Sequence, residues 1–194
     1  MKQDALLSLF KECGALLQGH FLLSSGLHSP QYLQCALVCR RPGVCEKLCS
    51  ELARSFDDAG IDAVIGPALG GVVIAYELAR ALGVDGIFAE RDGDGRMTLR
   101  RGFALGPGDA VLVVEDVMTT GGSAAEVVEW VTQSGATVAG VACLVDRGGL
   151  KRFADHRTAA LLKIDVPTYP PGNCPLCRDG VPVVKPGSRK RPGA

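Results

Sequence analysis

Residues 111–123, VLVVEDVMTTGGS, constrain the fold of this chain more than any other stretch of its 194 residues. Residues 111–114 are apolar at every position, which predicts a strand buried on both faces of a parallel sheet. Two carboxylates, Glu115 and Asp116, follow where this strand should leave the sheet. A turn rich in hydroxyl groups and glycine leads from there into AAEVVEWV, which has the apolar spacing of a helix.

A strand, a turn and a helix in this order place free backbone N–H groups and a helix N-terminus around a small concavity. Such a concavity suits a phosphate group. The adjacent carboxylates do not bind phosphate directly, but they suit the hydroxyl groups of a sugar or a metal ion. The alternative is a buried strand that ends in two solvated acids, and the strand–turn–helix context argues against it. The stretch therefore predicts a site for a sugar phosphate.

Strands and helices alternate along most of the chain. This order predicts an α/β fold with a central, mostly parallel sheet flanked by helices, in a single domain over 1–194 with its core at about 60–166. Ligands of such sheets bind at the carboxyl ends of the strands. The expected helices are 1–18, 42–59, 69–82 and 122–134, and the expected strands are 62–67, 84–90, 110–115, 136–146 and 159–166, with a strand–turn–strand unit at 19–35.

Charge and hydropathy exclude several classes of function. The formal net charge is zero, so no overall field attracts nucleic acid or a membrane surface. No apolar run reaches the length of a membrane span, and the N-terminus lacks a signal-peptide pattern, so we expect a cytoplasmic protein. The basic residues Lys185, Arg189, Lys190 and Arg191 lie among prolines and glycines, which predicts a solvated, flexible tail over 185–194.

The cysteines raise the question of a metal site. Six of the eight lie in apolar or helical contexts that are typical of reduced core residues. Cys174 and Cys177 have the spacing of a zinc knuckle or a redox pair. A tetrahedral zinc ion needs a second pair of ligands, and neither the other cysteine pairs nor the histidines (His20, His28 and His156) have a suitable spacing. We therefore expect no protein-bound metal at this pair.

Two further segments complete the predicted site. The glycine-rich turn after the strand at 62–67 contains Ala68, Leu69, Gly70 and Gly71, and its backbone could approach a second anion. For Gly71, close packing of helix on sheet is an equally good explanation. The DGDG sequence at 92–95 predicts a hairpin flanked by Arg91, Arg96, Arg100 and Arg101. For Arg100 and Arg101, an ordinary solvated face is the better interpretation.

The 111–123 stretch resembles the 5-phosphoribosyl-1-pyrophosphate (PRPP) motif of the type I phosphoribosyltransferases. The resemblance implies the type I phosphoribosyltransferase fold, with a small hood built mainly from residues 1–40. It implies that Glu115 and Asp116 hold the ribose hydroxyls, that the turn at 68–71 faces the pyrophosphate, and that Arg91 neutralises the leaving group. Arg91 and Asp116 are thus the candidate catalytic residues, and the implied PRPP-binding residues are Arg91, Glu115, Asp116, Val117, Met118, Thr119, Thr120, Gly121, Gly122 and Ser123.

The N-terminal segment resembles the hood of the orotate phosphoribosyltransferases, a pattern met at Leu23, Ser25, Gly26, Ser29 and Tyr32. The resemblance implies that Arg147 binds the carboxylate of orotate, which a planar, fork-shaped cation suits, and that Thr119 also reaches the base. A local surface pair between Asp146 and Arg147 is the alternative.

The implied reaction is transfer of the 5-phosphoribosyl group from PRPP to orotate, as in pyrimidine biosynthesis. Mg²⁺ would be bound mainly by PRPP itself, so no residue of the protein is assigned as a metal ligand. The implied assembly is a homodimer that shares the basic hairpin between subunits. Two alternatives stay open: a purine or xanthine phosphoribosyltransferase, and a non-catalytic regulator that senses PRPP.

Overall fold

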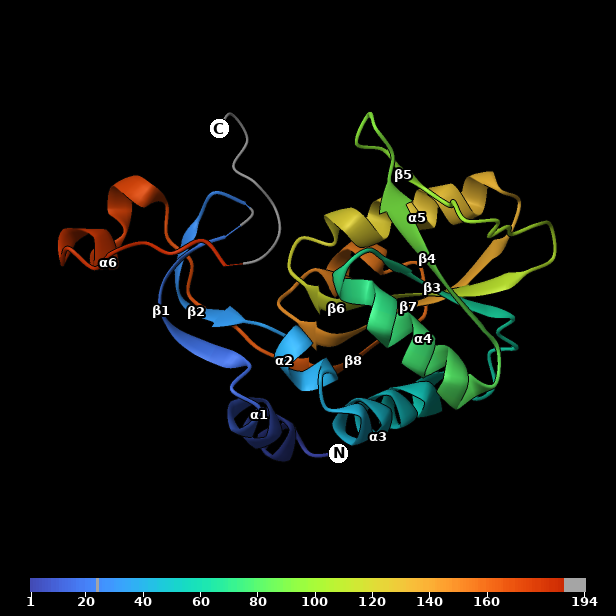
Figure 1. The fold of residues 1–194 in the computed structure, drawn as a ribbon, viewed down its shortest axis with the longest axis horizontal. Helices are drawn as coiled ribbons and strands as arrows, with labels where there is room; N and C mark the ends of the chain where they lie inside the picture. Colours follow the sequence, from blue (N-terminus) through green and yellow to red (C-terminus); the bar gives the residue numbers. More distant parts are fainter. Residues whose placement is uncertain (24, 187–194) are drawn as a thin grey trace.

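The computed structural model describes residues 1–23 and 25–186, and its fold is drawn in Figure 1. A six-stranded sheet with the order β5-β4-β3-β6-β7-β8 lies beside a two-stranded sheet, β1-β2. The strands are β1 (Leu16–Leu22), β2 (His28–Leu33), β3 (Ala63–Pro67), β4 (Asp85–Arg91), β5 (Met97–Thr98), β6 (Ala110–Met118), β7 (Thr137–Asp146) and β8 (Thr158–Lys163). The α-helices are α1 (Gln3–Glu12), α2 (Ala36–Cys39), α3 (Pro42–Ala53), α4 (Gly70–Leu82), α5 (Gly122–Gln133) and α6 (Pro175–Arg178), with 3-10 turns η1 (Arg54–Phe56), η2 (Leu150–Phe153) and η3 (Pro171–Asn173).

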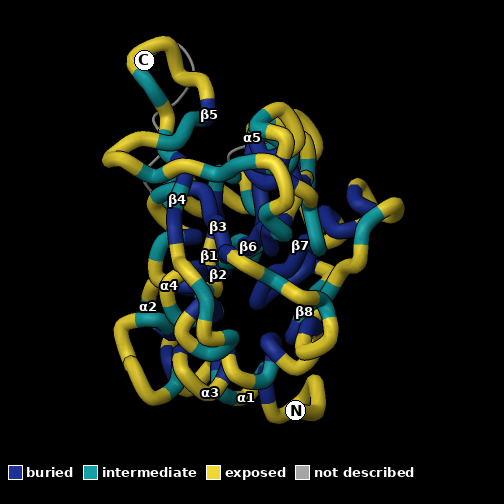
Figure 2. Tube along the Cα trace, turned by 90° about the vertical axis from the view of Figure 1, so that its right-hand side faces the viewer, coloured by how far each residue is buried: buried dark blue, intermediate teal, exposed yellow. Residues whose placement is uncertain are grey.

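The large sheet is parallel except at its edge strand β5, which pairs antiparallel with β4. Its central strands β3, β6 and β7 are buried on both faces along most of their length, as Figure 2 shows. Along β6, Leu112 and Val114 pack in the core that contains α1, α3 and α4, while Val111 and Val113 pack in the core beneath α5. The predicted α/β class and the mostly parallel sheet flanked by helices are confirmed.

The order of the strands in the large sheet determines where a ligand-binding crevice can form. The chain leaves β3 toward β4 on one side, and β6 then pairs with the other side of β3. This reversal opens a crevice between the connections that follow the two strands, and α/β sheets bind ligands in such crevices. The turn after β3 and the turn after β6 therefore face each other at the carboxyl edge of the sheet.

Several predicted boundaries were wrong. The helix predicted over 1–18 ends at Glu12, because Gly14 adopts a left-handed conformation (φ 69°) and the chain turns into β1. Leu6 and Phe10 of this helix are buried in the main core, so α1 packs with the core rather than in the hood. The helix predicted over 42–59 ends at Ala53 and continues only as η1. The strand predicted over 110–115 continues to Met118, and the last strand ends at Lys163.

The hood consists of the hairpin β1–β2 and the C-terminal segment 167–186, which lies against it (Figure 1). Tyr169 pairs with His28, and Val184 pairs with Phe21. The eight cysteines are free thiols, and Cys13, Cys35, Cys45, Cys49 and Cys143 are buried in the core as expected. Within residues 1–23 and 25–186, no helix is both long enough and apolar enough to cross a membrane.

Candidate active site

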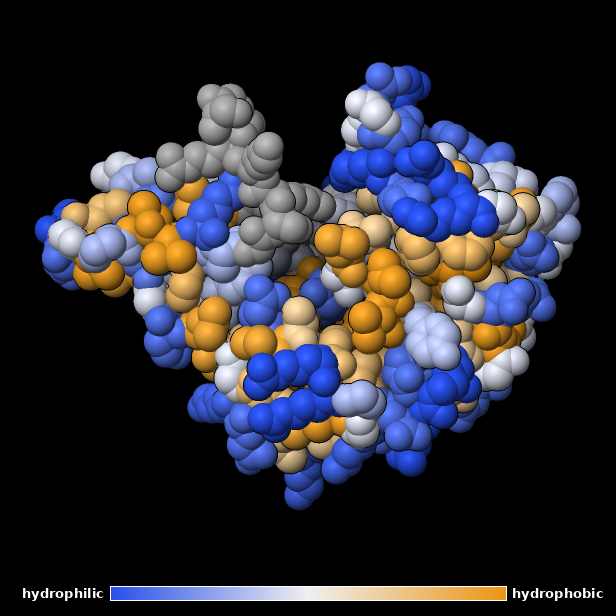
Figure 3. Space-filling model, viewed as in Figure 1, coloured by the Kyte–Doolittle hydropathy of each residue, from blue (hydrophilic) through white to orange (hydrophobic). Residues whose placement is uncertain are grey.

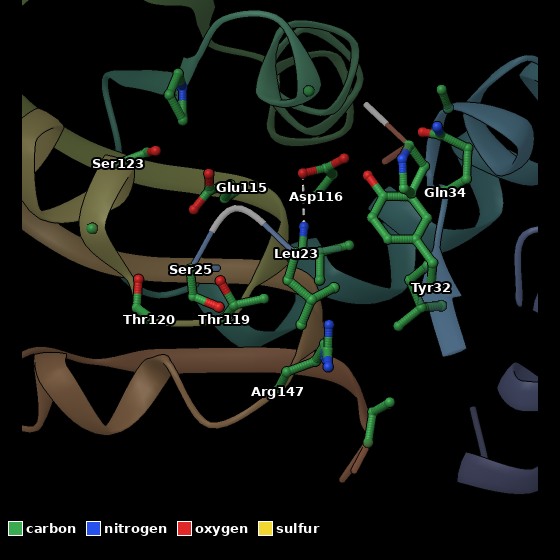
Figure 4. A pocket seen from close by; sticks show the side chains of 18 of the residues that line it. Leu23, Ser25, Tyr32, Gln34, Glu115, Asp116, Thr119, Thr120, Ser123 and Arg147 are labelled. Atoms are coloured by element: carbon green, nitrogen blue, oxygen red, sulfur yellow. Dashed lines mark hydrogen bonds between the residues drawn. The ribbon is translucent and has the colours of Figure 1, made fainter. Parts of the chain in front are cut away.

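A pocket of about 940 Å³ opens at the carboxyl edge of β3 and β6, beneath the hood. Its floor comes from the two turns after these strands, and its outer wall comes from β1–β2 and the C-terminal segment. In Figure 4 the side chains of Glu115, Asp116, Thr119, Tyr32 and Arg147 surround this cavity. The volume is at the upper end of the range for small-molecule sites.

Asp116 lies at the centre of the pocket floor, still within β6. One carboxylate oxygen accepts a hydrogen bond of 2.8 Å from the Val117 amide, drawn as a dashed line in Figure 4. A Cβ atom at Gly70, the first residue of α4, would lie 2.9 Å from both carboxylate oxygens, so a larger residue there would displace the Asp116 carboxylate. Burial raises the pKa of Asp116, and the hydrogen bond from Val117 opposes this rise. The half-buried Glu115 lines the same pocket.

The turn after β6 has the form of an anion cradle. Thr119 and Thr120 are exposed and line the pocket, and Gly121 adopts a left-handed conformation (φ 71°) that lets α5 begin at Gly122. The N-terminus of α5 therefore lies at the pocket, where the positive end of the helix dipole favours an anion. Of the implied PRPP residues, Val117, Gly122 and Ser123 also line the pocket. Met118 and Gly121 are buried beneath the turn and support it instead.

The turn after β3 forms the opposite side of the floor. Ala68, Leu69 and Gly70 line the pocket, and the Ala68–Leu69 peptide bond is cis. Gly71 does not line the pocket. A Cβ atom there would lie 3.0 Å from Pro67 Cδ and 3.1 Å from the backbone of Gly66, so Gly71 allows helix α4 to pack closely on β3.

Arg147 extends from the end of β7 into the pocket wall (Figure 4). Its backbone N–H donates a 2.8 Å hydrogen bond to the Met118 carbonyl, which ties it to the turn after β6. Asp146 accepts hydrogen bonds from the backbone of Gly148 and Leu150, at 2.9 and 3.2 Å, so it shapes this loop instead of pairing with Arg147. The Nε atom of Arg147 is buried and, among the described residues, is the only such side-chain nitrogen or oxygen without a hydrogen-bond partner.

Arg91 lies at the end of β4, and its side chain is directed to α5 rather than into the pocket. Its guanidinium group forms a bidentate ion pair with the Glu126 carboxylate, with N–O distances of 2.7 and 2.8 Å. Arg101, on the far side of the same hairpin, pairs with Glu90 at 3.0 Å. The structure thus brings together the acids, the threonine turn and Arg147, and it leaves the basic hairpin outside the pocket.

The pocket is also lined by residues to which the sequence analysis assigned no binding role. Tyr32 lies near the end of β2 and Gln34 directly follows this strand, and Asp165 and Thr168 come from the segment after β8. Lys185, which the sequence placed in the solvated tail, lies at the pocket wall because the adjacent Val184 pairs with β1. The remainder of that tail, 187–194, lies outside the described residues. Three residues of the hood pattern, Leu23, Ser25 and Tyr32, line the pocket and were the sequence signal for its outer wall.

The site combines a strand that ends in two acids, a hydroxyl-rich turn at a helix N-terminus and a second glycine turn across a switch in strand order. A family model described as the phosphoribosyl transferase domain matches residues 41–166. The chain therefore belongs to the phosphoribosyltransferase family.

Curated relatives make the comparison more specific. The chain is 56% identical over 190 residues to the orotate phosphoribosyltransferase of Pelotomaculum thermopropionicum. The aligned region covers 98% of this chain and 100% of the relative. It is 53% identical over 190 residues to the enzyme of the same name from Desulforamulus reducens, covering 98% and 99%. The crystal structure of orotate phosphoribosyltransferase from Aeropyrum pernix matches with a TM-score of 0.70 at 31% identity, covering 82% of this chain and 93% of that one. The predicted resemblance to the orotate phosphoribosyltransferases is confirmed.

Proposed function

We propose that the protein transfers the 5-phosphoribosyl group from PRPP to orotate, which forms orotidine 5-monophosphate and pyrophosphate in pyrimidine biosynthesis. The main structural support for this proposal is the Nε atom of Arg147, which is buried without a hydrogen-bond partner in the pocket wall next to the threonine turn. An unpaired buried donor is costly, and the carboxylate of orotate supplies the acceptor that it lacks. The names of the relatives that match nearly the whole chain support the same substrate.

In the proposed reaction, N1 of orotate bonds to C1 of the ribose while the bond from C1 to the pyrophosphate oxygen breaks. The bonding electrons leave with pyrophosphate, and the N1 proton of orotate passes to the departing pyrophosphate, directly or through water. Asp116 and Glu115 hold the ribose hydroxyls and oppose the positive charge that develops on the ring. Thr119, Thr120 and Ser123 hold the 5-phosphate with the N-terminus of α5. Most of the rate acceleration comes from positioning two substrates in one pocket.

Mg²⁺ is part of the proposal as an ion carried mainly by PRPP. The acidic side chains that line the pocket are Glu115, Asp116 and Asp165, and oxygen donors of this kind suit an ion that keeps several of its waters. Bound with PRPP, the ion would neutralise charge on the pyrophosphate. The protein contributes the orientation of the ribose through Asp116 and Glu115.

A homodimer is also proposed, with the basic hairpin completing a neighbouring site. Leu69, Val73 and Tyr76 lie on one side of α4 and are 76%, 48% and 66% exposed. Figure 3 shows hydrophobic side chains gathered over the first turns of α4, next to the pocket. An apolar helix face of this kind is typical of a subunit interface, and a second copy of the chain is the occupant that we propose. Arg91 would act on the leaving group after it exchanges Glu126 for pyrophosphate.

A cytoplasmic location completes the proposal and rests on the eight free cysteines. A purine phosphoribosyltransferase is disfavoured because a neutral purine offers Arg147 no anionic partner. The regulator alternative requires PRPP binding without turnover.

The test is the loss of orotate absorbance with purified protein, PRPP and Mg²⁺, with adenine, hypoxanthine and uracil measured in parallel. Consumption of orotate alone, dependent on both PRPP and Mg²⁺, is expected. Turnover of a purine, or PRPP binding without turnover of any base, would overturn the proposed reaction.

A further inference from the structure

Four side chains in the hood bring one potential metal-ligand atom each to a single point. Their donor atoms lie within 4.8 Å of one another. The residues are His20 of β1, His28 of β2, Cys174, which directly precedes α6, and Cys177 within α6. Three of the four residues are buried, and Cys177 is exposed. The cluster is separate from the pocket, since none of the four residues lines it.

The distances between these atoms approach those around a tetrahedral zinc ion. Zinc binds sulfur at about 2.3 Å and imidazole nitrogen at about 2.0–2.1 Å, so nitrogen and sulfur ligands lie roughly 3.5 Å apart. The Sγ atom of Cys174 lies 3.5 Å from His20 Nε2, and that of Cys177 lies 3.7 Å from the same atom and 3.3 Å from His28 Nδ1. The two imidazole nitrogens are 2.7 Å apart and would separate by about 0.6 Å around an ion.

The orientation of His20 also suits a metal ligand. Its Nδ1 lies 2.7 Å from the carbonyl oxygen of Val181, so this nitrogen carries the proton and donates it. The lone pair of Nε2 then points to the two sulfur atoms and to His28. Metal-binding histidines commonly donate their second ring nitrogen to a backbone carbonyl in this way, and the contact orients the ring for the cluster.

The surrounding segment has almost no hydrophobic core, so a metal ion would supply a restraint that side-chain burial does not. Among residues 167–186, only Cys174 is buried, and α6 buries none of its side chains. In Figure 1 the segment containing α6 projects away from the large sheet. Lobes too small to bury a core are commonly held by disulfides or by structural metals.

We propose that His20, His28, Cys174 and Cys177 bind a structural zinc ion that joins the C-terminal segment to the β1–β2 hairpin. Two thiolates and two imidazoles in a tetrahedral set favour zinc over harder divalent cations. Four protein ligands leave no open position, so the ion has no part in the chemistry. The segment that it holds begins near Thr168 and ends at Lys185, and both residues line the pocket. The ion thereby fixes the outer wall of the site.

The first experiment measures metal in the wild-type protein, made without an affinity tag in zinc-supplemented medium and purified under reducing conditions. Mass spectrometry of the metal content should find one zinc ion per chain. Replacement by Co²⁺ should produce a thiolate-to-cobalt charge-transfer band and the visible bands of tetrahedral cobalt. Both results come from wild-type protein and do not depend on a variant that folds.

Variants then locate the ion. Cys177→Ser and His28→Asn should abolish stoichiometric zinc and the cobalt bands, and a chelator should lower the melting temperature of the wild type but not of Cys177→Ser. Cys13→Ala and His156→Asn, which change a cysteine and a histidine outside the cluster, should keep one zinc per chain. Wild-type protein without zinc, or with a Cys174–Cys177 disulfide under reducing conditions, would overturn the proposal. Equal zinc in Cys177→Ser and the wild type would also overturn it.

Discussion

Replacing Gly149 by alanine should disturb the phosphate-binding turn from behind. Gly149 lies two residues after Arg147 and packs beneath the turn after β6. A Cβ atom there would lie 2.7 Å from Met118 Cγ, 2.9 Å from the Gly121 nitrogen and 2.9 Å from the Thr119 carbonyl oxygen. Two of these atoms belong to the backbone of the turn, so a side-chain rotation cannot relieve the overlap. The turn must move by about half an ångström to restore ordinary contact distances.

This displacement should affect stability and catalysis together. Overpacking of this kind costs about 1–3 kcal/mol, which for a chain of this size lowers the melting temperature by about 2–12 °C. A 1 Å misplacement of a catalytic group can cost roughly 100-fold in rate. For about half that shift, we expect roughly a tenfold loss in kcat/KM, mostly through a higher KM for PRPP because the turn holds the 5-phosphate.

The assay is the initial rate of orotate consumption at varied PRPP, together with thermal unfolding of the same samples. Gly148→Ala is the matched control. Gly148 has a φ of 98°, and a Cβ atom added there would meet no other atom within 4 Å, so alanine costs about 1–2 kcal/mol of backbone strain without pushing on the turn. It should lose stability and keep the PRPP KM. An unchanged KM in Gly149→Ala would refute the idea that this segment positions the turn.

Three other predictions concern single side chains of the site. Asp116→Asn should lower kcat by roughly 100-fold yet raise the melting temperature at neutral pH, because burial raises the pKa of Asp116 and its charged form therefore destabilises the fold. That stability gain is present above the raised pKa and should vanish as the pH falls below the ordinary value of 3.8, which thermal unfolding at several pH values checks. Arg147→Ala should raise the KM for orotate by roughly 10- to 100-fold and that for PRPP much less, and equal effects in steady-state kinetics would contradict its role. Arg91→Ala should lower kcat by roughly tenfold, whereas Glu126→Gln, which neutralises only the partner of Arg91, should leave kcat unchanged. Equal losses of kcat in the two variants would show that the ion pair has only a structural role.

Much of the fold could be predicted because its signals are local. Four consecutive apolar residues at 111–114 are completely buried, as a two-faced strand requires. The acids and the glycine turn that follow were located by their position after this strand. The extra length of β6, to Met118, was not predicted, because its last residues pair with β7 across the sheet, and such pairing does not show in a local pattern.

The direction of long side chains was harder to predict. Arg91 ends a strand near the site, and the resemblance to the phosphoribosyltransferases implied that it contacts the leaving group. In the structure its guanidinium group binds Glu126, which lies 35 residues later in the chain. Lys185 shows the opposite case, since its neighbours in sequence are typical of a tail, while the pairing of Val184 with Phe21 brings it to the pocket. Both outcomes depend on contacts between distant segments.

The histidine and cysteine cluster depends on the register of one hairpin. The sequence predicted two strands within 19–35, and a spacing of eight residues between His20 and His28 has no meaning without knowing which residues face each other. In the structure Leu22 pairs with His28, the register shifts between Gln18 and Phe21, and His20 Nε2 lies 2.7 Å from His28 Nδ1. Diagonal neighbours on one face of a hairpin are within reach of long side chains. The pair thus becomes a second half-site for Cys174 and Cys177 only through that register, which explains why the cysteine spacing alone indicated half of a zinc site.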